Sequence, residues 1–131
     1  MRIGNDLELR SLEAEHALEL YALVDSSRMH LRQWLPFVDN YESVSAARDF
    51  IRSFQERASK KEDMAFGIWF GGKLAGVVTY DYIDLSNRST LVGYWLGEWF
   101  QGKGIMTRSC EAIVDHAFKE LRLNRVEILC A

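Results

Sequence analysis

The residues with the clearest potential for chemistry lie in a glycine-rich turn, residues 101–107, which leads into a stretch of helical periodicity. Apolar residues recur from the end of this turn with steps of three, four and one, at Met106, Cys110, Ile113, Val114, Ala117, Phe118 and Leu121. This spacing predicts an amphipathic helix that begins within a residue or two of Gly104 and has these residues on its core face.

The start of such a helix can bind an anion. Its first turn has backbone N–H groups without partners and the positive end of the helix dipole. Because Gly102 and Gly104 have no side chains, an anion can approach this backbone closely. Lys103 and Arg108 add positive charge beside the glycines. The turn therefore predicts a phosphate-binding site.

Two common phosphate-binding motifs do not fit the turn. A Walker loop ends in Gly-Lys-Ser/Thr after four spacer residues, whereas Lys103 lies between the two glycines. A dinucleotide-binding fingerprint has a third glycine, where this chain has Thr107, and closes the first strand of a parallel sheet. A third kind of phosphate site is needed to explain the turn.

The elements that position the turn follow from the periodicity of the remaining chain. Alternating or continuous apolar runs predict strands at 6–12, 64–70, 73–82, 90–96 and 125–130. Helical spacing predicts helices at 14–24, after Ser26 and Ser27, from Ser43, and from Gly104. Gly71 and Gly72 form a two-residue hairpin turn, and a single helix joins the last two strands in parallel. The fold class is α/β, with a mixed, mostly antiparallel sheet and helices on both of its faces.

Composition limits the kinds of ligand and location. The 131 residues form one domain, and 16 basic against 19 acidic residues leave a net charge of −3, which argues against nucleic acid as the main ligand. No apolar run approaches the ~20 residues of a membrane span, and the start has no signal-peptide pattern. Cys110 and Cys130 lie in apolar patterns, as reduced thiols of a cytoplasmic protein do. No Cys/His cluster has metal-binding spacing, so we expect no metal.

The turn resembles the acetyl-CoA site of the GNAT superfamily. That pattern is Gln or Arg, two spacers, Gly, one spacer, and Gly or Ala, and here Gln101, Gly104 and Met106 align with it. Met106 is the departure, and its place on the core face of the helix directs its bulk away from the phosphates. Three further stretches resemble the branch that acetylates the N-termini of ribosomal proteins: residues 34–37, 93–96 and 102–104.

The resemblance implies acetyl-CoA as cosubstrate. In that family a bulge in the fourth strand parts it from the fifth, and the arm of CoA pairs there with main-chain groups. Carried over, Tyr94, Trp95 and Leu96 hold the arm, and the Leu96 N–H faces the thioester carbonyl as a catalytic donor. The pyrophosphate is held by Gln101, Gly102, Lys103, Gly104, Ile105, Met106 and Thr107. The alternative for residues 94–96 is a plain core strand.

The acceptor side of the reaction is less specified. Glu98, just after the fourth strand, is the first candidate for a catalytic base acting through water, and Asp81 is the second; each can equally be a solvated surface charge. His16 and His116 fall away from the apolar faces of their helices and are expected at the surface. Trp34, Leu35 and Phe37 either floor the acceptor groove or belong to the core.

The predicted function is therefore N-acetyl transfer from acetyl-CoA to an amine. The α-amine of a protein, such as a ribosomal protein, is the expected acceptor, because its pKa near 8 leaves far more free base at neutral pH than a lysine pKa near 10.4. Alternatives are a small amine, such as a polyamine or an antibiotic, and a non-catalytic module that senses CoA.

The end of the chain carries a separate expectation. In the resembling family a helix and a strand hairpin, with the proton donor for the thiolate, follow the fifth strand. Here the chain ends at Ala131, directly after the predicted last strand. We therefore expect the sequence to be a fragment, truncated after the fifth strand, and its bare sheet edge to favour homo-oligomers.

Overall fold

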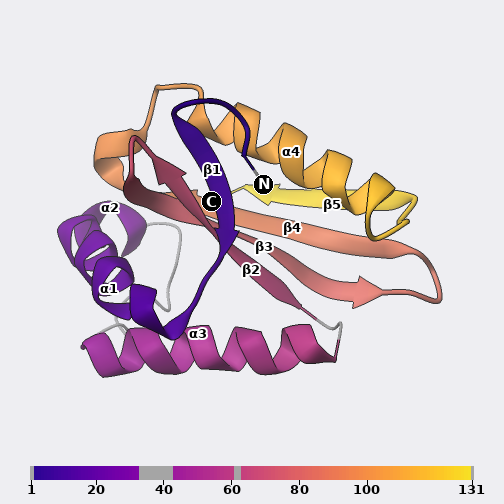
Figure 1. The fold of residues 1–131 in the computed structure, drawn as a ribbon, viewed down its shortest axis with the longest axis horizontal. Helices are drawn as coiled ribbons and strands as arrows, with labels where there is room; N and C mark the ends of the chain where they lie inside the picture. Colours follow the sequence, from indigo (N-terminus) through magenta and orange to yellow (C-terminus); the bar gives the residue numbers. More distant parts are fainter. Residues whose placement is uncertain (1, 33–42, 61–62, 131) are drawn as a thin grey trace.

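The computed structural model describes residues 2–32, 43–60 and 63–130, and Figure 1 shows their arrangement. The elements in chain order are β1 (Leu7–Ser11), η1 (Ala14–His16), α1 (Ala17–Ser26), α2 (Arg28–Arg32), α3 (Val44–Ser59), β2 (Met64–Phe70), β3 (Lys73–Asp84), β4 (Ser89–Leu96), η3 (Glu98–Phe100), α4 (Ile105–Lys119) and β5 (Arg125–Cys130). All five predicted strands are present. The predicted 14–24 helix is divided into a 3₁₀ turn and an α-helix, and residues 34–37 lie outside the described residues.

The sheet has the order β1-β2-β3-β4-β5. The pairs from β1 to β4 are antiparallel, and β4 pairs with β5 in parallel after the α4 connection. Gly71 and Gly72, at φ 59° and 81°, form the tight β2–β3 turn. These are backbone angles that glycine adopts without strain, so the hairpin prediction is confirmed.

Helices cover both faces of the sheet, which confirms the predicted fold class. One face carries α1 and α3, whose buried residues such as Leu20 and Ile51 pack with Val77 and Trp95 of the sheet. The other face carries α4 and packs against a second cluster, which includes Val78, Tyr80, Val92, Leu96 and Ile113. Figure 1 shows α3 and α4 on opposite sides of the strands. Neighbouring residues of β3 and β4 therefore contribute to different cores.

The buried face of α4 differs from the predicted one. Its buried residues are Ile105, Ser109, Ile113 and Ala117, four residues apart. Met106 is half-buried and Phe118 is 45% exposed, so the placement of Phe118 in the core was wrong. The small side chains of Ser109 and Ala117 let the helix approach the sheet closely, which favours this stripe over the one that begins at Met106.

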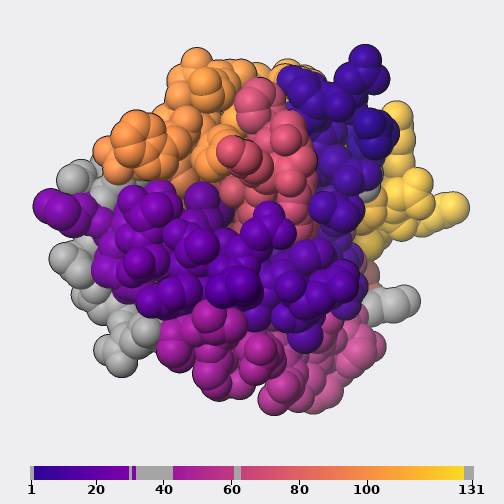
Figure 2. Space-filling model, turned by 60° about the vertical axis from the view of Figure 1, so that its left-hand side comes forward, coloured from indigo at the N-terminus to yellow at the C-terminus, as the bar shows by residue number. Residues whose placement is uncertain are grey.

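Two features fix the helices on the opposite face. Ser43 caps α3 as predicted, since its side chain accepts a hydrogen bond from Ala46 N at 3.1 Å. Glu98 N donates to Ser27 Oγ at 3.0 Å, which ties η3 to the α1–α2 junction. Figure 2 shows the orange residues of this loop next to the purple residues of α1 and α2.

Among the residues that the structure describes, none of the helices has the length and apolar character that a membrane span requires.

Candidate functional site

The start of α4 has the open backbone that the sequence predicts. Gly102 and Gly104 have φ values of 77° and 72°, and no atom lies within 4 Å of a Cβ built at either position. Gly104 is the N-cap residue and no side chain caps the helix. Arg108 N donates to Gly104 O at 3.2 Å, which is the first hydrogen bond of the helix. The N–H groups of residues 105–107 therefore have no partner within the helix. An anion can reach these groups without meeting a side chain at either glycine.

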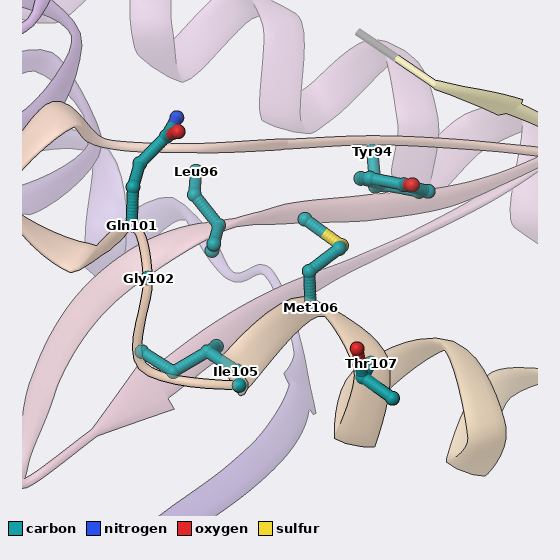
Figure 3. A pocket seen from close by; sticks show the side chains of 8 residues that line it. Tyr94, Leu96, Gln101, Gly102, Ile105, Met106 and Thr107 are labelled. Carbon is teal, nitrogen blue, oxygen red and sulfur yellow. The ribbon is translucent and has the colours of Figure 1, made fainter.

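A pocket of about 290 Å³ opens at this helix start. It is lined by Tyr94, Leu96, Gln101, Gly102, Gly104, Ile105, Met106 and Thr107, and all eight belong to the predicted site. Figure 3 shows Met106 extending from the first turn of α4 toward the strand that carries Tyr94 and Leu96. Met106 therefore lines the pocket while it also packs against the α4-side core, and the expectation that its bulk points away from the phosphates stays a prediction.

The two faces of β4 separate the predicted arm-binding residues. Tyr94 and Leu96 pack on the α4 side, where the pocket lies, whereas Trp95 is 8% exposed within the α1–α3 core. Of the predicted set, the Trp95 and Lys103 side chains do not line the pocket. A ligand in this pocket could therefore contact Trp95 only through the main chain of that residue.

The direction of the Leu96 N–H follows from the sheet pairing. Gly97 N donates to Ala75 O of β3 at 2.8 Å, and N–H directions alternate along a strand between antiparallel neighbours. Leu96 N–H therefore points away from β3, toward the β5 side of β4. This geometry is compatible with the predicted role of this N–H as a donor.

The bulge expected in β4 is not found among the described pairs. β4 pairs with β3 in regular register from Leu91 to Leu96, and with β5 in regular register from Ser89 to Tyr94. The register shifts lie elsewhere, between Ile68 and Trp69 against β3 and between Asp81 and Asp84 against β4. The irregular pairings therefore lie outside residues 91–96 of β4.

The charges beside the turn differ in their availability. Arg108 forms a two-pronged ion pair with Asp6, with N···O distances of 3.1 and 2.8 Å. This guanidinium holds the pKa of the Asp6 carboxyl below its ordinary value. Arg108 thus lies beside the glycines as predicted, and the Asp6 carboxylate compensates its charge. Lys103 is exposed at the turn, and its role in phosphate binding stays a prediction.

Neither predicted base lies in the pocket. Glu98 is exposed in η3 and is not among the lining residues. Asp81 is half-buried on the α1–α3 side of β3, where it accepts a hydrogen bond from Thr79 Oγ1 at 3.1 Å. Burial raises the pKa of Asp81, the Thr79 hydrogen bond opposes this rise, and the charge of Asp63 adds to it. The role of Glu98 stays a prediction.

A polar pair that the sequence did not predict lies beneath α4. The Tyr80 hydroxyl donates to Ile113 O at 2.6 Å and lies 2.9 Å from His116 Nδ1. Because the hydroxyl proton is used on the carbonyl, Nδ1 carries the proton that joins the two side chains. Burial raises the pKa of Tyr80 and lowers that of His116.

The surface placement of the two histidines was wrong, since both are half-buried. His16 packs edge-on to Trp69 with ring centroids 4.7 Å apart. The burial of His116 could have been suspected from Tyr80, which alternation in its strand can direct inward. A buried tyrosine hydroxyl requires a hydrogen-bond partner, and His116 is a polar residue of the helix that covers this face.

The residues at the helix start fit the diphosphate of CoA. The open glycines, the unpaired N–H groups and the exposed Lys103 all favour a compact anion, and the adjoining pocket walls from Tyr94 and Leu96 are apolar or aromatic. The size and placement of the pocket along β4 allow a chain attached to that diphosphate to reach Leu96.

Comparison with known proteins agrees with this fit. The family model described as "Acetyltransferase (GNAT) domain" matches residues 6–131. The chain is 31% identical to the Bacillus subtilis protein named "Putative ribosomal N-acetyltransferase YdaF", covering 99% of this chain and 72% of that protein. It is 28% identical to the ribosomal-protein-serine acetyltransferase of Escherichia coli, covering 99% of this chain and 73% of that protein.

A solved structure extends the likeness to the fold. It is the RimL ribosomal L7/L12 α-N-protein acetyltransferase in complex with coenzyme A, with a TM-score of 0.92, 28% identity, and coverage of 97% of this chain and 72% of that one. The non-catalytic sensor is set aside, because the relatives are named as enzymes. This chain belongs to the GNAT family and is an N-acetyltransferase that uses acetyl-CoA.

Proposed function

We propose that the enzyme acetylates the N-terminal α-amine of a protein, of the kind found in ribosomal proteins. The observation that carries the proposal is the open helix start at Gly104, which adjoins a strand whose Leu96 N–H points to the β5 side. Similarity to proteins named for ribosomal-protein acetylation supports the acceptor class. An α-amine also suits a site without a base in its pocket, because about a tenth of it is neutral at pH 7.

The residues have distinct roles in this proposal. The backbone N–H groups at 102–107 and Lys103 bind and orient the diphosphate of CoA. Acetyl-CoA supplies a thioester whose carbonyl carbon the free amine attacks, with the thiolate of CoA as the leaving group. In this proposal the Leu96 N–H donates to the carbonyl oxygen as negative charge develops there. Glu98 takes the amine proton through water.

The direct test mixes the protein with acetyl-CoA and synthetic peptides that begin with Ser or Ala. Release of free thiol and mass spectrometry of the peptide report transfer and its position. Matched peptides with a blocked N-terminus and an internal lysine should not react. Acetylation of the lysine rather than the α-amine would contradict the proposed acceptor class.

The same experiment tests the small-amine alternative with spermidine as the acceptor. Spermidine N(1)-acetyltransferase of Escherichia coli is 24% identical over 98% of this chain, so spermidine is the appropriate small substrate. A kcat/KM for spermidine well above that for every α-amine peptide would replace the protein acceptor with a polyamine.

A further inference from the structure

A small polar cluster, formed by Thr79, Asp81 and Gly93, lies on the sheet face opposite the CoA pocket. Thr79 and Asp81 alternate with Val78 and Tyr80, which pack under α4, so they point to the other side. Thr79 pairs with Gly93 across β3 and β4, and its Oγ1 donates to Asp81 Oδ2 at 3.1 Å. The cluster is thus built on two central strands.

The absence of a side chain at Gly93 keeps the Asp81 carboxylate accessible. A Cβ at Gly93 would lie 3.2 Å from Asp81 Oδ2 and 3.3 Å from Thr79 Oγ1, which is closer than most Cβ contacts. The carboxylate therefore leans over Gly93 along β4. Any residue with a side chain at this position would cover the oxygen that faces β4.

Among the described residues, the Asp81 carboxylate accepts a hydrogen bond from Thr79 and forms no ion pair. The nearby guanidinium of Arg57 pairs with Asp63, with Nε 2.8 Å from Oδ2. The charge of Asp63 raises the pKa of Asp81, as burial does, and the charge of Arg57 lowers it. A half-buried carboxylate is costly to maintain when its hydrogen-bond partner is a hydroxyl and the nearby guanidinium is paired with another carboxylate. A cationic group of a ligand would relieve that cost.

The position of the cluster along β4 limits what it can contact. Gly93 precedes Leu96 by three residues, which is about 10 Å along a strand. A catalytic base must come within about 3 Å of the proton it removes, directly or through one water. Asp81 is therefore too distant to deprotonate an amine that attacks beside Leu96, but it can bind a second part of the same acceptor.

We propose that Asp81, oriented by Thr79 over Gly93, is a specificity-determining residue that binds a cationic side chain of the acceptor about 10 Å from the amine that is acetylated. This proposal rests on the proposed function. An extended peptide spans about 3.3–3.6 Å per residue. The cation is therefore a lysine or arginine within the second to fourth residue of the acceptor.

The test compares two peptides that begin with Ser and differ only by Lys or Gln at their third residue. With the wild-type enzyme, KM should be at least tenfold lower for the lysine peptide. Asp81→Asn should raise KM for the lysine peptide at least tenfold, leave kcat within about twofold, and leave the glutamine peptide unchanged. Gly93→Ala, which places a methyl group against the carboxylate, should have the same effect with the charge intact.

Controls separate this effect from folding and from cofactor binding. Asp115→Asn removes one negative charge from an exposed position of α4 and should change neither KM. Calorimetric titration should give equal CoA affinity for wild type, Asp81→Asn and Gly93→Ala. If Asp81→Asn is unfolded by circular dichroism, Thr79→Val, which removes only the orienting hydroxyl, provides the same comparison.

The outcomes distinguish the two proposals. Equal KM values for the lysine and glutamine peptides in wild type and Asp81→Asn would overturn the role of Asp81 while the proposed function stands. If no peptide is acetylated, the proposed function fails, and calorimetric binding of the two peptides to the CoA-bound protein still decides whether Asp81 discriminates charge. A preference for spermidine that depends on Asp81 would overturn the assignment of the cation to a peptide.

Discussion

Replacement of Gly104 by glutamate is the sharpest test of the CoA site. Gly104 has φ 72° and no atom within 4 Å of a built Cβ, so the first carbon of a new side chain meets no neighbouring atom. Gly72 in the β2–β3 turn is a matched control, with φ 81° and equally open surroundings. Both substitutions place an L-residue in the left-handed region, and each should lower the free energy of unfolding by about 1–2 kcal/mol.

The two variants should differ in their affinity for CoA. At Gly104 the new carboxylate lies where the diphosphate is bound, and two like charges 4 Å apart repel by about 1 kcal/mol in water and about 4 kcal/mol near a protein surface. Since about 1.4 kcal/mol is a factor of ten, we expect Gly104→Glu to weaken CoA binding at least tenfold. Gly72→Glu, at a turn that does not line the pocket, should leave the affinity unchanged.

Isothermal titration calorimetry with CoA measures the affinity, and urea unfolding measures the stability of each variant. Unchanged CoA affinity in Gly104→Glu would show that the diphosphate does not bind at the start of α4. An equal loss of affinity in Gly72→Glu would show that the left-handed backbone strain, rather than the new charge, is responsible.

Three further measurements test the surroundings of the site. Burial lowers the pKa of His116 below 6.5, so the folded state binds fewer protons; the free energy of unfolding should fall as pH drops through that value, and His116→Gln should flatten this dependence in urea titrations. Ser109 Oγ is buried without a hydrogen-bond partner in the described part of the chain. Ser109→Ala should therefore raise the unfolding free energy by about 1 kcal/mol, measured in the same way. Lys103→Ala should weaken CoA binding more than Arg108→Ala, because Arg108 is already paired with Asp6; a reversed order in calorimetry would contradict this.

Local sequence signals predicted the sheet and the pocket well. Strand β2 begins and ends at the predicted residues, because a run of apolar residues meets two glycines that fix the turn. The pocket was predictable because its lining comes from one continuous stretch of strand, turn and helix. In both cases the deciding interactions are between residues close in sequence.

The errors concern interactions between distant residues. The orientation of α4 depends on packing against the sheet, and a helical wheel cannot choose between the neighbouring apolar residues Ile105 and Met106. Tyr80 and His116 are 36 residues apart, and Asp6 and Arg108 are 102 apart. Alternation in β3 places Tyr80 and Asp81 on opposite faces, but only the assembled fold shows which face carries α4.

The division of β4 between two faces has a consequence for how the gene can vary in length. Tyr94 and Leu96 face the pocket, and Gly93 and Trp95 face the opposite side. A single-codon insertion or deletion within this strand would exchange the two sets from that point onward, directing Trp95 into the pocket and Leu96 into the α1–α3 core. The exposed turn at 85–88 can absorb the same change without moving the strand. Functional length variants of this enzyme should therefore differ in that turn and keep the codon count of β4 constant.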